Sequence, residues 1–264
     1  MNIPFFRELD IWVSCLFLFF AMLLFMWLGS IVGRKKSEKG KVPESDGNKT
    51  IFGAVFGLMA FLLAFTFGMS GSRFESRRAA SITEANAIGT AILRADLYPE
   101  EHRKAFRADF KDYLQARIDY LSCQRDDPKL KESTLAQQKA TNSLWKRAMQ
   151  LSINPPSIIP SNQMIPALND MFDSATSNDY GELMTVPQSI VFMLFILSFV
   201  SSFFVGYIWG EKGKLDWYVT TGFCFLSALV IFITLDLDRP RRGLIKLDTS
   251  HNAIFSQIDQ FKGE

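Results

Sequence analysis

Cysteine and histidine are scarce in this sequence, which contains three cysteines and two histidines among 264 residues. Cys15 and Cys224 lie inside long apolar runs and Cys123 stands alone, which excludes a disulfide framework and a zinc site of the CxxC type. His102 and His251 are isolated from each other, and we interpret both as surface residues. We therefore expect no cofactor and no resident metal.

The motifs of familiar enzyme classes are also missing. The sequence has no nucleophile elbow, no phosphate-binding loop, no dinucleotide-binding glycine pattern and no HExxH motif. The net charge is +2, and no basic stretch is interleaved with aromatic residues, so nothing indicates a nucleic-acid partner. The sequence therefore does not support an enzyme.

Four long apolar runs dominate the chain, at about 11–32, 51–70, 186–207 and 217–235. Because about 20 apolar residues in a helix cross the hydrocarbon core, each run predicts a transmembrane helix. The first run is too long for the apolar core of a signal peptide. No run has an ionisable residue well inside it, which argues against a proton-coupled pump and against an enzyme acting within the membrane.

The segment between the second and third runs predicts a helical extramembrane domain. Apolar residues at helical spacing predict helices over 75–97, 100–123, 129–151 and, more briefly, 163–175. Prolines, including Pro160, are expected to break the chain between them. We interpret the charged residues of this domain as solvated helix faces. The second run is expected to continue into the first of these helices, with a pause at Gly68, Ser70 and Gly71.

These elements define an all-α membrane protein in which two transmembrane hairpins flank a helical extramembrane domain. We expect the first hairpin over 1–72, the helical domain over 73–185, the second hairpin over 186–237 and a C-terminal tail over 238–264. The tail is either a short amphipathic helix or a mobile segment.

Lysines and arginines leave the orientation open. The loop after the first run is rich in lysine, which places it in the cytoplasm by the positive-inside rule. Arginines directly after the second and fourth runs favour the opposite orientation, and the two counts nearly cancel.

Four acidic residues near the ends of the predicted spans are weak candidates for a metal site. Asp236 and Asp238, together with Asp179 and Glu182, offer oxygen ligands of the kind that a hard cation prefers. The simpler interpretation, which we favour, is that these charges end helices at the membrane interface.

The second apolar run carries the most informative pattern. A ridge of small residues, which allows close helix packing in lipid, consists of Gly53, Gly57, Ala60, Ala64 and Gly68. Beside it lie Phe61, Phe65 and Met69, spaced four apart. In a ring of subunits, this line predicts an apolar constriction that gates by dewetting. On the pattern alone, the interpretation that we favour is that these side chains face lipid or pack within one subunit.

Several strings of the sequence resemble the bacterial bestrophin-like domain membrane proteins. They are 72–78 (SRFESRR), 84–91 (EANAIGTA), 93–97 (LRADL), 235–240 (LDLDRP) and 243–245 (GLI). The resemblance extends from the first apolar run to about residue 246. It implies a multi-pass protein of the bacterial cytoplasmic (inner) membrane.

Bestrophins are pentameric anion channels, so the resemblance implies an oligomeric channel. In bestrophins the second transmembrane helix lines the pore neck with apolar side chains, and the domain after it is cytosolic. On that pattern Phe61, Phe65 and Met69 match the neck. Two features depart from it. The lysine-rich loop would lie outside the cell. The acidic calcium clasp of animal bestrophins is not recognisable, and Asp236 and Asp238 resemble it only loosely.

The sequence therefore predicts a homo-oligomer, with a pentamer expected, that conducts small ions passively across the lipid bilayer and favours anions. Phe61, Phe65 and Met69 are expected to form the constriction. The pore mouth carries hydroxyls and positive charges that attract anions, from Thr66, Ser70, Ser72, Arg73, Arg77 and Arg78. The alternative is a non-conducting scaffold or sensor whose helical domain binds a partner or ligand, and the small-residue ridge fits it equally well.

Overall fold

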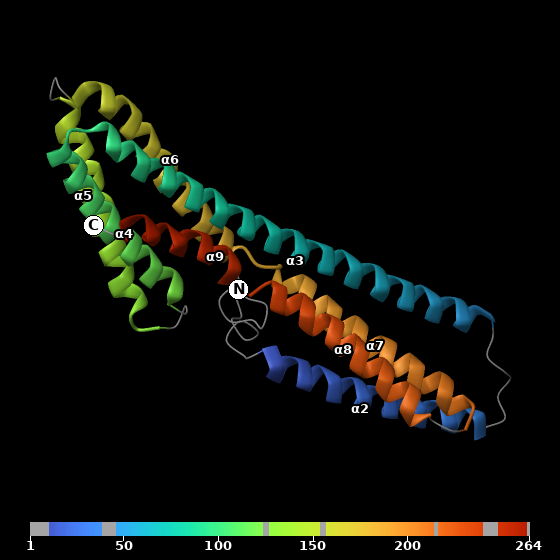
Figure 1. The fold of residues 1–264 in the computed structure, drawn as a ribbon. Helices are drawn as coiled ribbons and strands as arrows, with labels where there is room; N and C mark the ends of the chain where they lie inside the picture. Colours follow the sequence, from blue (N-terminus) through green and yellow to red (C-terminus); the bar gives the residue numbers. More distant parts are fainter. Residues whose placement is uncertain are drawn as a thin grey trace. The chain divides into compact units, whose positions relative to one another are not determined.

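The computed structural model of the protein describes residues 11–38, 46–123, 127–153, 157–213, 216–239 and 248–262. Within these ranges every regular element is a helix, and four helical stretches are long and apolar enough to cross a membrane. The predicted class, an all-α membrane protein with four transmembrane helices, is confirmed. The chain divides into two compact units, which are described one at a time (Figure 1).

The first unit combines residues 1–72 with 185–239 and contains the apolar spans. Its helices are α2 (Ile11–Glu38), the first part of α3 (Asp46–Arg94), α7 (Gln188–Glu211) and α8 (Trp217–Leu237). Within this unit, α2 packs along α7 and α8. The side chains buried between them include Leu18, Met22, Met26, Phe195 and Ile231.

Glycines set the closest approach in this unit, between α2 and α7. A Cβ atom added to Gly29 would lie 2.1 Å from the carbonyl oxygen of Phe203, and one added to Gly206 would lie 1.9 Å from that of Met26. The same close contact is repeated one turn further on, at Gly33 and Gly210. Because glycine has no Cβ atom, the two backbones come into direct contact. Such contact maximises dispersion attraction, which drives helix packing in lipid because no hydrophobic effect acts between helices there.

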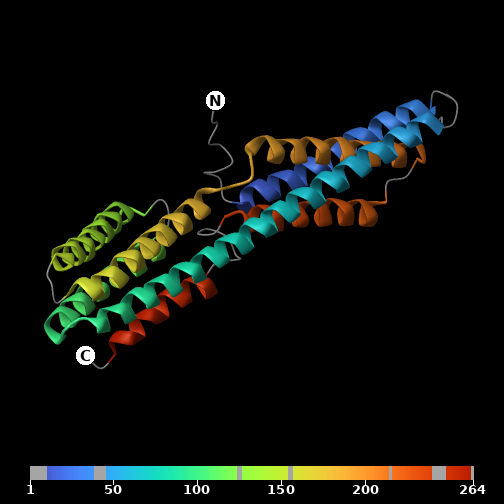
Figure 2. The ribbon, with the colours of Figure 1, turned by 90° about the horizontal axis from the view of Figure 1, so that it is seen from above.

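The helix α3 is a single α-helix of 49 residues. Its first part belongs to the first unit and its second part to the other unit (Figure 2). The helix does not end at the expected pause around Gly68, Ser70 and Gly71. Because interior backbone groups bond within the helix itself, the same element is stable both in hydrocarbon and in water.

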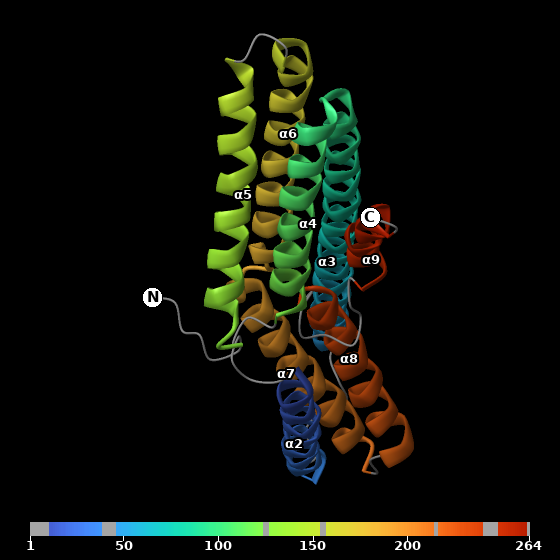
Figure 3. The same ribbon diagram turned by 60° about the vertical axis from the view of Figure 1, so that its left-hand side comes forward.

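The second unit combines residues 73–184 with 240–264 and is a helical bundle (Figure 3). After α3 its elements are η1 (Ala95–Leu97), α4 (Glu100–Ser122), α5 (Leu130–Ser152), α6 (Ile158–Leu183), α9 (Asp248–Phe255) and η3 (Ser256–Phe261). The core includes Ile88, Phe106, Phe110, Leu144 and Met164. Ile254 and Phe261 join the same core, so the C-terminal segment packs as part of this unit.

One helix of this unit differs clearly from the sequence-based prediction. The helix expected over 163–175 is α6, which begins at Ile158 and ends at Leu183. Pro160 was expected to break the chain, but it lies in the first turn of α6, where a backbone N–H has no partner within the helix. Pro166 removes one hydrogen bond inside α6 without ending it. The predicted bounds of α4 and α5 agree with the structure within one residue.

The contact between α2 and α7 generates a stability prediction. Replacing Gly206→Ala should lower the free energy of unfolding by about 1–3 kcal/mol, because the added methyl group collides with backbone rather than with a side chain that can move. Gly222→Ala in α8 is the matched control, since a Cβ there meets nothing within 4 Å. Denaturant unfolding of both variants in detergent micelles measures the difference. Equal stability of the two variants would contradict the close contact.

Candidate functional site

Among the residues that the structure describes, none covers one face of the first part of α3. Of the four apolar stretches it is the least enclosed, with 17% of its apolar window buried against 33% to 39% for the others. A Cβ atom added to Gly53, Gly57 or Gly68 would meet nothing within 4 Å. Ala60 and Ala64 are exposed as well. The whole predicted ridge of small residues is therefore open, and in a membrane it is covered by lipid or by another chain.

Phe61 and Phe65 share this uncovered face. Their exposed fractions are 69% and 55%, and their rings stack with centroids 6.5 Å apart and planes inclined by 14°. Gly57 precedes Phe61 by four residues and Gly68 follows Phe65 by three, so all four lie on one side of the helix. The structure thus brings the phenylalanines and the glycine ridge together.

Met69, Thr66 and Ser70 turn towards the interior of the same unit. Met69 is partly buried against the core between α2, α7 and α8. Thr66 is fully buried and donates its hydroxyl to the carbonyl of Leu62 at 2.7 Å, and Ser70 is also fully buried. A step of four residues turns about 40° around a helix, so Met69 lies between the uncovered face and the buried side that Thr66 and Ser70 occupy.

The three arginines expected at a pore mouth have different environments. Arg77 is 1% exposed, and its guanidinium donates to the carbonyl of Gly181 at 3.1 Å and to that of Met184. These carbonyls lie at the C-terminal end of α6, so Arg77 caps that helix and does not fit the predicted role at an aqueous mouth. Arg78 and Ser72 are exposed, and Arg73 is partly buried.

A buried ion cluster joins three helices of the second unit. Arg117 of α4 is fully buried and donates to both carboxylate oxygens of Glu84 of α3, at 2.6 and 2.8 Å. It also donates to Oδ1 of Asp179 of α6 at 2.9 Å. Asn178 donates a further hydrogen bond to Glu84 at 2.8 Å. The paired hydrogen bonds between Arg117 and Glu84 offset the cost of removing these two charges from water.

Burial and charge compete within this cluster. Burial opposes the charge of Arg117, but the carboxylates of Glu84 and Asp179 outweigh it and raise the pKa of the guanidinium. For Asp179, burial prevails over the effect of Arg117, and the pKa of its carboxyl is raised. Two carboxylates face one guanidinium, so the cluster carries one surplus negative charge.

The interpretation of the charged residues as solvated helix faces is wrong for Arg77, Glu84 and Arg117. The apolar pattern contained a signal for Arg117, which follows the buried Phe110 by seven residues and therefore lies on the core stripe of its helix. His251, expected on the surface, is also buried, with its Nε2 3.4 Å from a carboxylate oxygen of Glu182.

The acidic residues considered for a metal have other partners. Asp238 accepts a hydrogen bond from the backbone N–H of Val186 at 2.6 Å, just ahead of α7, and Asp236 is buried. Asp179 belongs to the cluster around Arg117. Among the residues that the structure describes, no three His, Cys, Asp or Glu side chains come together to hold a metal ion.

Comparison with known proteins identifies the family. The profile of the bestrophin-like domain matches residues 15–251. The chain belongs to the bestrophin-like family. No curated protein matches the sequence.

Solved structures share the bestrophin fold. A variant of a bacterial bestrophin homologue from Klebsiella pneumoniae matches with a TM-score of 0.72 and 15% identity, covering 95% of this chain and 100% of its own. The structure of that homologue obtained by zinc phasing matches with a TM-score of 0.66 and 18% identity, over 93% of this chain and 98% of its own. At this level of identity the likeness establishes the fold.

The buried cluster generates a second prediction. Replacing Arg117 with methionine should lower the free energy of unfolding by about 3–5 kcal/mol, because Glu84 would remain fully buried, and Asp179 partly buried, without their shared cation. Lys104→Met is the control, since Lys104 pairs with Glu100 on an exposed face of the same helix. Chemical unfolding followed by circular dichroism measures both. A loss for Arg117→Met no larger than for Lys104→Met would contradict a structural role for the cluster.

Proposed function

We propose that this bestrophin-like protein is an oligomeric channel that conducts small ions passively, with the uncovered face of α3 lining the pore. The single observation that carries the proposal is the exposure of Phe61 and Phe65 beside a row of open glycines on the least enclosed span. Family membership supports it, because bestrophin homologues are oligomeric ion channels.

The chemistry of this face suits a narrow, gated passage. The phenylalanine rings offer no charge and no hydrogen bond, so a ring of them repels water when the passage is narrow. In the closed state the passage contains no water, and this dewetting alone stops ions without any side chain filling the passage. Opening requires only that the rings move apart far enough for a continuous column of water to form.

The open glycines favour another protein chain over lipid as the cover of this face. Small residues let helix backbones approach closely, and that advantage is lost against flexible lipid tails. Neighbouring copies of α3 packed through Gly53, Gly57 and Gly68 would bring their phenylalanines towards a common axis. A pentamer in the bacterial cytoplasmic membrane is the assembly that the resemblance to bestrophins favours.

Anion preference rests on the arginines beyond the constriction. Arg73 and Arg78 follow Phe65 on α3 by two and nearly four helical turns, and Arg78 is exposed. Positive charge at an entrance concentrates anions and repels cations. Arg77 does not contribute to this field in the same way, because its guanidinium is committed to the end of α6.

Ion flux into liposomes tests the proposed pore. Phe65→Ala should raise chloride flux about tenfold over wild type, which corresponds to lowering the barrier by about 1.4 kcal/mol, because a smaller side chain admits water to the neck. Phe67→Ala is the matched control, since Phe67 is also exposed but lies about 160° around α3 from Phe65. Equal flux from the two variants would reject Phe65 as part of the constriction.

The size of the assembly separates the channel from a non-conducting scaffold. The same open glycines would also support a simple dimer of α3 helices, in which the phenylalanines face lipid. Light scattering of the purified protein, corrected for detergent, should give a closed ring of several copies. A dimer that shows no flux in any variant would favour the scaffold.

A further inference from the structure

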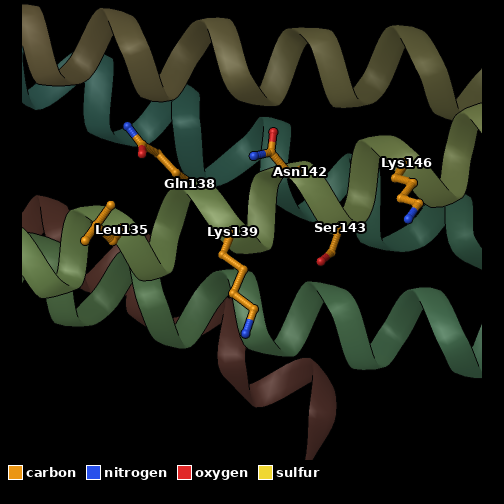
Figure 4. A pocket seen from close by; sticks show the side chains of 6 residues that line it. All are labelled: Leu135, Gln138, Lys139, Asn142, Ser143 and Lys146. Carbon is orange, nitrogen blue, oxygen red and sulfur yellow. The ribbon is translucent and has the colours of Figure 1, made fainter.

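A pocket of about 530 Å³ opens in the second unit between α4, α5 and α6. Six of the nine described residues that line it are threonine, glutamine or asparagine, and both their polar and their apolar atoms form its wall. Among the described residues that line it, Tyr120 is the one aromatic side chain and Asp179 the one charged side chain. Gln138 and Asn142 also border a shallower neighbouring depression, where Figure 4 shows them on the side of α5 that faces α6.

Asp179 connects this pocket to the buried ion cluster. Its Oδ1 accepts from Arg117, while its side chain stays 29% exposed and lines the pocket. Among the described residues, its Oδ2 has no hydrogen-bond or ion-pair partner. The carboxylate of Asp179 therefore presents the surplus negative charge of the cluster to the pocket.

We propose that this pocket binds a small organic cation that carries a primary ammonium group. An ammonium has three N–H donors and no acceptor, which matches the Oδ2 of Asp179 in a pocket that amide and hydroxyl groups also line. The ring of Tyr120, whose centroid lies 5.2 Å from the guanidinium carbon of Arg117, provides a wall for the apolar carbon of the ligand. A volume of about 530 Å³ admits a molecule with a short carbon chain.

Two other ligand classes fit less well. Hard metal ions prefer several carboxylates, and the pocket offers one, which already shares its charge with Arg117. Anions would meet the carboxylate of Asp179 with no lysine, arginine or histidine among the described lining residues. The proposal does not depend on ion conduction, because the pocket lies wholly within the second unit.

Calorimetric titration of the full-length protein in detergent tests the proposal, with putrescine as the probe and 1,4-butanediol as its uncharged equivalent. Asp179→Asn keeps the shape of the side chain but removes its charge. Thr141→Phe leaves the carboxylate in place and fills the pocket. Asp119→Asn is the matched control, since Asp119 is an exposed residue of α4 that does not line the pocket. Thermal melting verifies that each variant is folded.

Wild type and Asp119→Asn should bind putrescine saturably and with equal affinity, and neither should bind butanediol. Asp179→Asn and Thr141→Phe should each weaken putrescine binding by about tenfold or more. The proposal is overturned if wild type shows no saturable binding at millimolar putrescine, or if butanediol binds as well as putrescine. It is also overturned if Thr141→Phe, once shown to be folded, binds like wild type.

Discussion

The structure depends on one constraint, which is that α3 must remain helical through two different solvents. In hydrocarbon a backbone has no water to bond with, so the helix must satisfy its own polar groups. In the aqueous part, the same geometry places Glu84 and Ile88 on the inner side of a bundle. One unbroken helix of 49 residues therefore presents an open apolar face in its first part and buried side chains of the bundle core in its second.

Each of the two units is stabilised internally by a different kind of interaction. Between α2 and α7, glycines bring backbones into contact, because dispersion replaces the hydrophobic effect when the surroundings are as apolar as the protein. In the second unit, burial of side chains such as Phe106 and Leu144 removes apolar area from water. The ion cluster around Arg117 adds specificity, since its geometry is satisfied only when α3, α4 and α6 are in register.

The lengths of the apolar runs predicted the transmembrane helices well, because bilayer thickness and helical rise leave little freedom. Reasoning from the sequence could not show which pair of glycines lies at a contact between helices. Gly29 and Gly53 each begin a four-residue glycine spacing, yet only the first is enclosed, and that difference depends on which helix lies opposite. The exposure of Phe61 beside open glycines is likewise a tertiary property. Arg117 was missed because its charge concealed its place on an apolar stripe.

The pairing of α2 with α7 has a consequence for the synthesis of the protein on the ribosome. Lys36 and its hydrogen-bond partner Tyr207, at the ends of these helices, are separated by 171 residues. At ordinary rates of translation the ribosome needs about 10–30 s to cover that distance. Throughout this interval the first span sits in the membrane with its glycines against lipid or against the insertion machinery. Premature termination ahead of α7 would leave the glycines of α2 without the backbone against which they pack.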